Sequence, residues 1–238
     1  MNSLVSESMP LLLILMGALF VHGSFQLGVS VLTRLSSHTI GKSKSPRQLL
    51  GLSLHYILGV IVATTSVVLG ATTTFAWLKS INSELPNLLV MGLLPVIGLL
   101  VIGFYYRRDK GTQLWLPRPF IDYLMNRAKK THSGVEAAML GAATVVGELP
   151  FIIAPIGIVS LWIAALTPQS SWLGLGLLYS SLASLPLVFL ALYISSGHKI
   201  SAVQRWREQN KSFLQWTSGL ALILLDAFIV SYMLKGSA

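Results

Sequence analysis

The chain has no cysteine among its 238 residues and little charge. The missing cysteines exclude disulfide bonds, thiol nucleophiles, thiolate metal sites and CxxC redox pairs. Charged residues make up 11% of the chain, against about 25% in an ordinary soluble domain. Walker, HExxH, GxSxG and dinucleotide-binding motifs do not occur either. We therefore expect neither a water-soluble enzyme nor a pump that hydrolyses ATP by itself.

Hydrophobic residues are abundant instead, at 53% of the chain, and the mean hydropathy is +0.71. Six apolar segments reach the roughly 20 residues that a membrane-spanning helix needs. They cover residues 9–33, 48–78, 86–106, 135–166, 171–195 and 214–234. No basic residue precedes the first segment, which is also too long for a cleaved signal peptide. The sequence predicts an all-α integral membrane protein with six transmembrane helices.

The basic residues mark one side of this predicted bundle. Fifteen of the 17 Lys and Arg residues fall in the first, third and fifth connections, and only Lys79 and Lys235 fall outside them. Lys and Arg are retained on the cytoplasmic side, so we expect both termini outside and a location in the cytoplasmic (plasma or inner) membrane. The net charge of +9 then fits anionic lipid headgroups, and no nucleic-acid partner is needed.

The third connection contains a short amphipathic pattern after Pro119, which suits the first turn of a helix. The apolar residues that share one helical face are Phe120, Ile121, Leu124, Met125 and Ala128. This spacing predicts a helix lying on the inner membrane surface, with a solvated linker as the alternative.

Two pairs of segments resemble each other at nearly the same distance along the chain. Gly17–Gln26 aligns with Gly141–Pro150 at an offset of 124, and Leu50–Tyr56 aligns with Leu173–Tyr179 at an offset of 123. These matches predict a duplicated unit.

The two copies would be residues 1–110 and 135–238, each with three spans, joined by the cytoplasmic loop 111–134. Because three is odd, the second copy enters the membrane in the opposite orientation. The result is a 3+3 inverted repeat.

Inverted repeats in transporters place the substrate site near the midplane, where matching helices are broken by Gly or Pro. The expected breaks are at Gly23 in the first span and at Gly147, Pro150 and Pro155 in the fourth. Ser24 and Glu148 would each lie about 20 Å deep, at 1.5 Å per residue, and would meet there.

Glu148 is the leading candidate for chemistry, because a carboxylate at the bilayer centre costs roughly 2.5–3.5 kcal/mol. Prolines beside it free helix carbonyls, so Glu148 can bind a cation or carry a proton. The alternative is a protonated Glu bonded to a neighbouring helix. His22 and Ser24 would face Glu148 across the repeat axis, and Gln26 would add a neutral donor and acceptor.

Asp226 and His55 complete the candidate set. Asp226 either joins the site or bonds to another span. His22 and His55 can titrate near neutral pH or ligate a metal, or each can be a buried histidine that bonds one carbonyl; whether a metal binds stays open. For His38, His132 and His198 we expect solvated loop histidines rather than a metal-sensing cluster. We expect no cofactor. The repeated glycines, such as Gly59 and Gly141, are expected to let helices pack closely.

The paired breaks in Gly17–Gln26 and Gly141–Pro155 make the chain resemble the superfamily of lysine exporters and cytochrome c biogenesis transmembrane proteins. The resemblance covers most of the chain in organisation and is specific in those two stretches alone. It implies the six-span scaffold and its use by exporters. The thiol-reductant branch carries a Cys-Pro pair at these breaks. Ser24 and Glu148 stand there in this chain, so electron relay is excluded.

These observations together favour a secondary transporter that exports a small solute or cation by alternating access. The alternative is a non-transporting membrane scaffold or assembly factor on the same fold, in which the basic loops dock a partner. The lipid bilayer and a small-molecule or ion substrate are the expected partners, and a homo-oligomer is left open.

Overall fold

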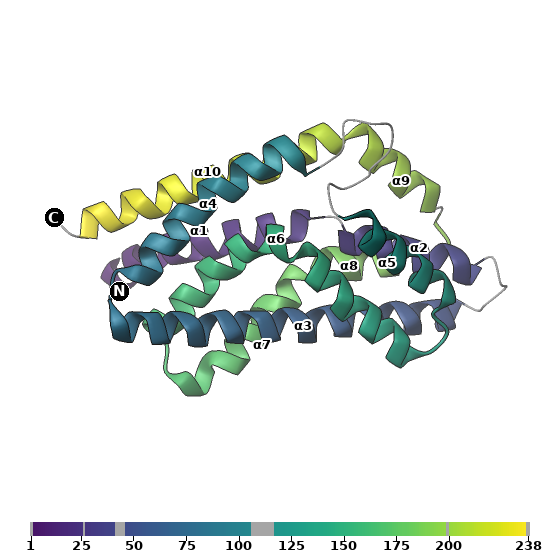
Figure 1. Ribbon diagram of the computed structural model, residues 1–238, viewed down its shortest axis with the longest axis horizontal. Helices are drawn as coiled ribbons and strands as arrows, with labels where there is room; N and C mark the ends of the chain where they lie inside the picture. The colour runs from purple at the N-terminus through teal and green to yellow at the C-terminus, as the bar shows by residue number, and fades with distance from the viewer. Residues whose placement is uncertain (1, 26, 41–45, 106–116, 199, 237–238) are drawn as a thin grey trace.

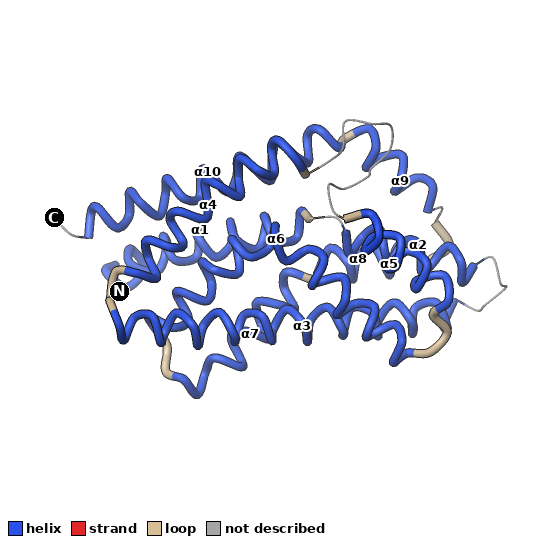
Figure 2. Tube along the Cα trace, in the orientation of Figure 1, coloured by secondary structure: helices blue, strands red, loops and turns tan. Residues whose placement is uncertain are grey.

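The computed structural model describes residues 2–25, 27–40, 46–105, 117–198 and 200–236. Every regular element within these ranges is a helix (Figures 1 and 2), so the predicted all-α class is confirmed. The helices are α1 (Asn2–Ser24), α2 (Leu27–Ile40), α3 (Pro46–Ile81), α4 (Leu85–Phe104), α5 (Arg118–Lys130), α6 (Gly134–Leu166), the 3-10 turn η1 (Gln169–Ser171), α7 (Trp172–Ala183), α8 (Leu185–Ser195), α9 (Ile200–Gln209) and α10 (Lys211–Gly236).

Four of these helices, α3, α4, α6 and α10, are each long and apolar enough to cross a membrane. Two bent pairs reach the same length: α1 with α2, at an angle of 44°, and α7 with α8, at 45°. The described chain therefore has four to six candidate spans, and they lie at the six predicted positions.

The fourth span is not broken, which corrects the prediction for Pro150 and Pro155. Both prolines lie inside the continuous helix α6. A membrane helix tolerates an internal proline because neighbouring groups satisfy the freed carbonyl. The second bend lies in the fifth span, where Pro186 occupies the first turn of α8. Proline suits that position because its missing N–H has no helical partner there.

Glycine sets the closest crossing in the bundle, between α3 and α6. A Cβ at Gly59 would overlap the backbone of Ala138, and a Cβ at Gly141 would overlap the carbonyl of Tyr56. Small residues allow helices to approach to this distance in lipid. These two glycines therefore serve packing, as the sequence predicted.

A second close contact joins α4 to α10. A Cβ on Gly98 would lie 2.9 Å from the Gly219 carbonyl oxygen, and a Cβ on Gly219 would lie 2.7 Å from that of Gly98. One helical turn away, the Gln215 amide donates to the carbonyls of Val101 and Ile102, at 3.0 and 2.6 Å. Gln215 thereby ties α10 to the C-terminal end of α4, where the Val101 carbonyl also accepts the Tyr105 backbone N–H at 3.2 Å.

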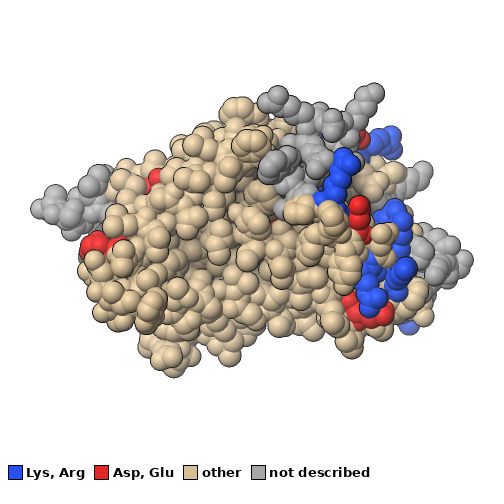
Figure 3. Space-filling model, viewed as in Figure 1, with Lys and Arg blue, Asp and Glu red and all other residues tan. Residues whose placement is uncertain are grey.

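The surface of the bundle is apolar over much of its length, and Leu88, Leu99, Met139 and Phe189 are each more than 60% exposed. On the face in Figure 3 the Lys and Arg side chains gather at one end, the end where α2, α5 and α9 lie in Figure 1. The start of α1 and the end of α10 lie at the opposite end. Long apolar helices with a lipid-compatible surface are those of an integral membrane protein.

The predicted helix in the third connection is present as α5, at the basic end. Leu124 and Ala128 face the protein and are almost fully buried, whereas Tyr123 is 58% exposed. The corner after α5 is fixed by Ser133 and Glu136, which form a capping box at the start of α6. Glu136 also lies 3.6 Å from Arg127 of α5.

Candidate functional site

The two bent pairs touch each other at their bends. A Cβ on Gly23, next to the last residue of α1, would lie 3.2 Å from the Pro186 ring of α8. On the other side of the same bend, a Cβ on Gly28 would lie 3.5 Å from the Leu187 side chain. The paired breaks thus come from the first and fifth spans, and not from the first and fourth.

Glu148 of α6 binds the start of α2. Its Oε1 accepts hydrogen bonds from the backbone N–H groups of Leu27, at 2.6 Å, and Gly28, at 3.3 Å. The first N–H groups of a helix have no helical partner, and the helix dipole favours a negative charge at that end. The break in the first span therefore creates a binding site for the carboxylate of the fourth.

Tyr56 of α3 ties this region together. Its hydroxyl lies 3.2 Å from the Gly28 carbonyl oxygen and 3.1 Å from Thr144 Oγ1. Thr144 donates its own proton to the Leu140 carbonyl, so the phenolic proton can go to either neighbour. The first turn of α2 is thus held by α3 and α6 together.

A buried cation lies on the other side of α2. Arg207 of α9 is only 3% exposed, and its Nη2 donates to Ser30 Oγ at 2.9 Å. Its guanidinium also attracts the Glu148 carboxylate electrostatically. The neighbouring Arg205 and Glu208 are exposed. Arg207 is therefore the charged side chain of α9 that points toward the site.

Three aromatic rings close the bend on a further side. Phe25, between α1 and α2, packs against Tyr105 and Phe151 with centroid distances of 5.3 and 5.9 Å. Tyr105 and Phe151 are in edge contact at 4.8 Å. Phe151 lies one turn after Glu148 on α6, so the acidic group and the apolar cover belong to the same helix.

Ser24 and His22 have other partners than the predicted ones. Ser24 Oγ donates to the Val21 carbonyl at 2.6 Å and lies 2.7 Å from Ser218 Oγ of α10. His22 Nδ1 lies 2.9 Å from the Tyr179 hydroxyl of α7. These contacts turn both side chains toward α7 and α10, whereas Glu148 contacts the start of α2. The structure therefore brings the three residues to one bend without pairing them.

His55 and Asp226 lie apart from this group. His55 is exposed, contacts the Gly51 carbonyl at 2.7 Å and borders Gly134, which precedes Glu148 by about 21 Å of helix. Asp226 lies about 12 Å along α10 from Ser218, and its Oδ1 is buried with no hydrogen-bond partner in the described chain.

The two remaining candidate positions are Gln26 and Gly147. Gln26 lies outside the described residues. Gly147 does not break its helix. Its lack of a side chain leaves room for Phe120 of α5 and Leu27 of α2, with which a Cβ at this position would collide. Among the described residues, no three His, Asp or Glu side chains are grouped so that they could hold a metal ion.

Tyr56, Tyr179 and Arg207 belong to the site and were missed in the sequence. The signal for the tyrosines was present, because Tyr56 and Tyr179 occupy the same place in the aligned segments Leu50–Tyr56 and Leu173–Tyr179. They contact the two sides of one bend, at Gly28 and His22. Arg207 lies four residues after the apolar Val203, so both side chains are on the same face of α9. This spacing can identify the face of α9 that points into the bundle.

No protein-family model, no curated protein and no solved structure matches this chain.

Proposed function

We propose that this protein is a secondary-active transporter that exports a small solute or cation. The observation that carries the proposal is Glu148, a carboxylate inside a membrane-spanning helix that is bound to the N-terminal turn of α2. Ionisable residues within membrane spans are costly and mark ion or substrate pathways. Discontinuous helices that meet inside a bundle are the usual place of substrate and ion sites in transporters.

The working step is a change in the charge on Glu148. A proton or a cation on the carboxylate weakens its two charge-assisted hydrogen bonds to Leu27 and Gly28. The start of α2 then keeps its contact with the Tyr56 hydroxyl but is held less firmly by α6, so that the angle between α1 and α2 can change. Alternating access follows when this change opens the bend to one side of the membrane and closes it to the other.

The topology forms part of the proposal. The basic end of the molecule faces the cytoplasm by the positive-inside rule, which puts both termini outside and the basic side chains at anionic headgroups of the cytoplasmic membrane. The aligned tyrosines Tyr56 and Tyr179 support a 3+3 inverted repeat. The resemblance to lysine exporters supports the outward direction.

Flux through proteoliposomes tests the proposal. Purified protein is screened with amino acids and divalent cations for an increase in melting temperature, and each stabilising solute is then tested for movement across the bilayer with an entrapped pH-sensitive dye. We expect Glu148→Gln to abolish flux and its pH dependence. The matched control is Glu84→Gln, an exposed carboxylate at the start of α4, which should leave both unchanged. Equal flux in wild type and Glu148→Gln would refute the mechanism.

A membrane scaffold or assembly factor is the second candidate, and one observation favours it. Both carboxylate bonds of Glu148 go to the backbone of this same chain, which is the pattern of a residue that fixes helix packing. In that case a partner protein should co-purify in stoichiometric amount, and no solute should shift the melting temperature.

A further inference from the structure

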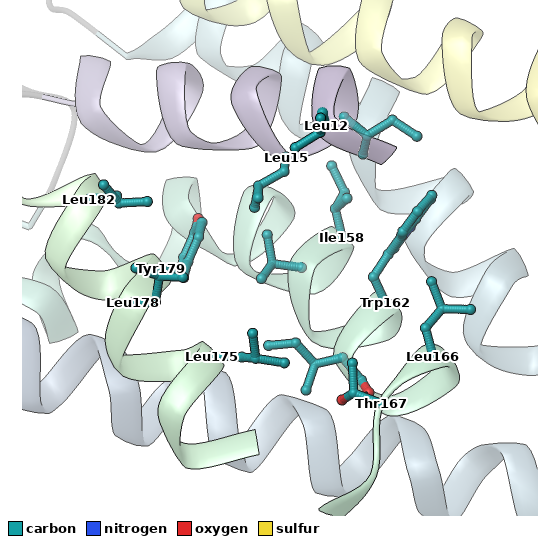
Figure 4. A pocket seen from close by; sticks show the side chains of 13 residues that line it. Leu12, Leu15, Ile158, Trp162, Leu166, Thr167, Leu175, Leu178, Tyr179 and Leu182 are labelled. Atoms are coloured by element: carbon teal, nitrogen blue, oxygen red, sulfur yellow. The ribbon is translucent and has the colours of Figure 1, made fainter. Parts of the chain in front are cut away.

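An apolar cavity lies away from the Glu148 site, between α1, α6 and α7 (Figure 4). Its volume is about 230 Å³. Tyr179 and Trp162 stand on opposite sides of it, with Leu15 and Ile158 between them. All three helices belong to candidate membrane spans or bent pairs. We therefore expect the cavity to lie at the depth of the hydrocarbon core of the bilayer.

The cavity has a buried floor and an open rim. Ile14 and Ile158 are each only 1% exposed, whereas Leu12, Leu166 and Leu178 are each more than half exposed. The exposed side chains are apolar and lie on the outside of the bundle. The cavity therefore opens sideways toward the bilayer.

The two hydroxyl groups in the lining are already engaged. The Tyr179 hydroxyl is bonded to His22, and the Thr167 hydroxyl donates to the Ile163 carbonyl at 2.7 Å. A buried water needs two to four polar partners, and an apolar cavity of roughly 150 Å³ stays dry. Water is thus a poor occupant, and an empty cavity forfeits the dispersion contacts of its lining.

We propose that this cavity binds one acyl chain of a membrane lipid, which enters from the bilayer between the exposed rim residues. The chain would lie along Leu15, Ile158 and Leu175 and end against the Tyr179 ring. Tyr179 connects the cavity to the bend, because its hydroxyl contacts His22, one residue before Gly23. The inference concerns lipid binding alone and does not depend on transport.

A photoreactive phospholipid with a diazirine at the end of one acyl chain tests the proposal. The full-length protein is reconstituted in phosphatidylcholine vesicles with increasing mole fractions of the probe, and the crosslinked residues are mapped by mass spectrometry. We expect adducts on the lining residues to saturate, because a site has a fixed capacity. Adducts at Leu99, which is 63% exposed on α4, should rise in proportion to the probe.

Two variants that narrow the cavity, Leu15→Phe and Leu175→Phe, provide the second readout. Both positions are partly buried, so the added volume enters the cavity and not the tight core. Each variant should lower the cavity adducts several-fold and leave the Leu99 adducts unchanged, while Leu99→Phe should leave the cavity adducts unchanged. Cavity adducts that rise in proportion to the probe, or that persist undiminished in both narrowed variants, would overturn the proposal.

Discussion

The Glu148 carboxylate and the backbone N–H of Leu27 lie 2.6 Å apart, across the point where α1 ends and α2 begins. This contact joins residues separated by 121 positions in the chain. It supplies an acceptor to the first N–H group of α2, which has no acceptor within its own helix.

Removal of the Glu148 side chain should destabilise the fold more than neutralisation. Glu148→Ala leaves the Leu27 and Gly28 N–H groups without an acceptor, which costs about 1–3 kcal/mol. Glu148→Gln keeps a carbonyl oxygen at the same place and loses only the charge. Thermal unfolding in detergent should rank the melting temperatures as wild type, Glu148→Gln, then Glu148→Ala. Equal values for the two variants would show that the contact adds nothing.

The α3–α6 crossing should not tolerate a side chain at Gly59. Gly59→Ala places a Cβ against the Ala138 backbone, so the helices must separate and core contacts are lost. Gly70→Ala on the same helix meets nothing within 4 Å, and alanine is favoured over glycine in a helix by about 1 kcal/mol. The melting temperature should fall for Gly59→Ala and hold or rise for Gly70→Ala.

The His22–Tyr179 pair should appear as a coupling energy. Tyr179→Phe and His22→Phe each remove one partner, and the double variant closes a mutant cycle. Contacting residues typically couple by about 0.5–3 kcal/mol. Tyr123→Phe on the exposed face of α5 is the control for loss of a hydroxyl, and its effect should add to that of His22→Phe. A coupling near zero for His22 and Tyr179 would mean that the contact is not energetically significant.

Arg207 should hold α9 against the bundle. Arg207→Met removes the donor to Ser30 while it keeps most of the side-chain volume. Amide hydrogen exchange in α9 should become several-fold faster, because local opening no longer breaks this contact. Arg205→Met on the same helix is exposed and should leave the exchange unchanged. If both variants behave alike, α9 is held by other contacts.

The positions of the helices could be predicted from the sequence, because apolar runs of sufficient length determine them. The bends could be predicted only in part. The break predicted at Gly23 lies near the first bend, which comes between Ser24 and Leu27. Pro150 and Pro155 did not interrupt α6, because a proline inside a packed membrane helix loses one hydrogen bond without ending the helix.

The partners of the polar side chains were harder to predict. Composition and depth place Glu148 inside the bundle, but its contact with Leu27 depends on how α2 starts after the break. Tyr179 and Arg207 reach the bend because α7 and α9 pack beside it. A local sequence pattern does not specify which helices pack together, so it does not predict these contacts by itself. The duplicated tyrosines and the spacing of Val203 and Arg207 were the sequence signals that pointed to these contacts.

The contact between Gly23 and Pro186 makes the two bends depend on each other. A change in the α1–α2 angle moves Gly23 against a rigid ring that belongs to the other bent pair. Neither pair can straighten alone without a collision or a gap at this point. In the proposed transport cycle we therefore expect the two bent pairs to move together, as interlocked parts.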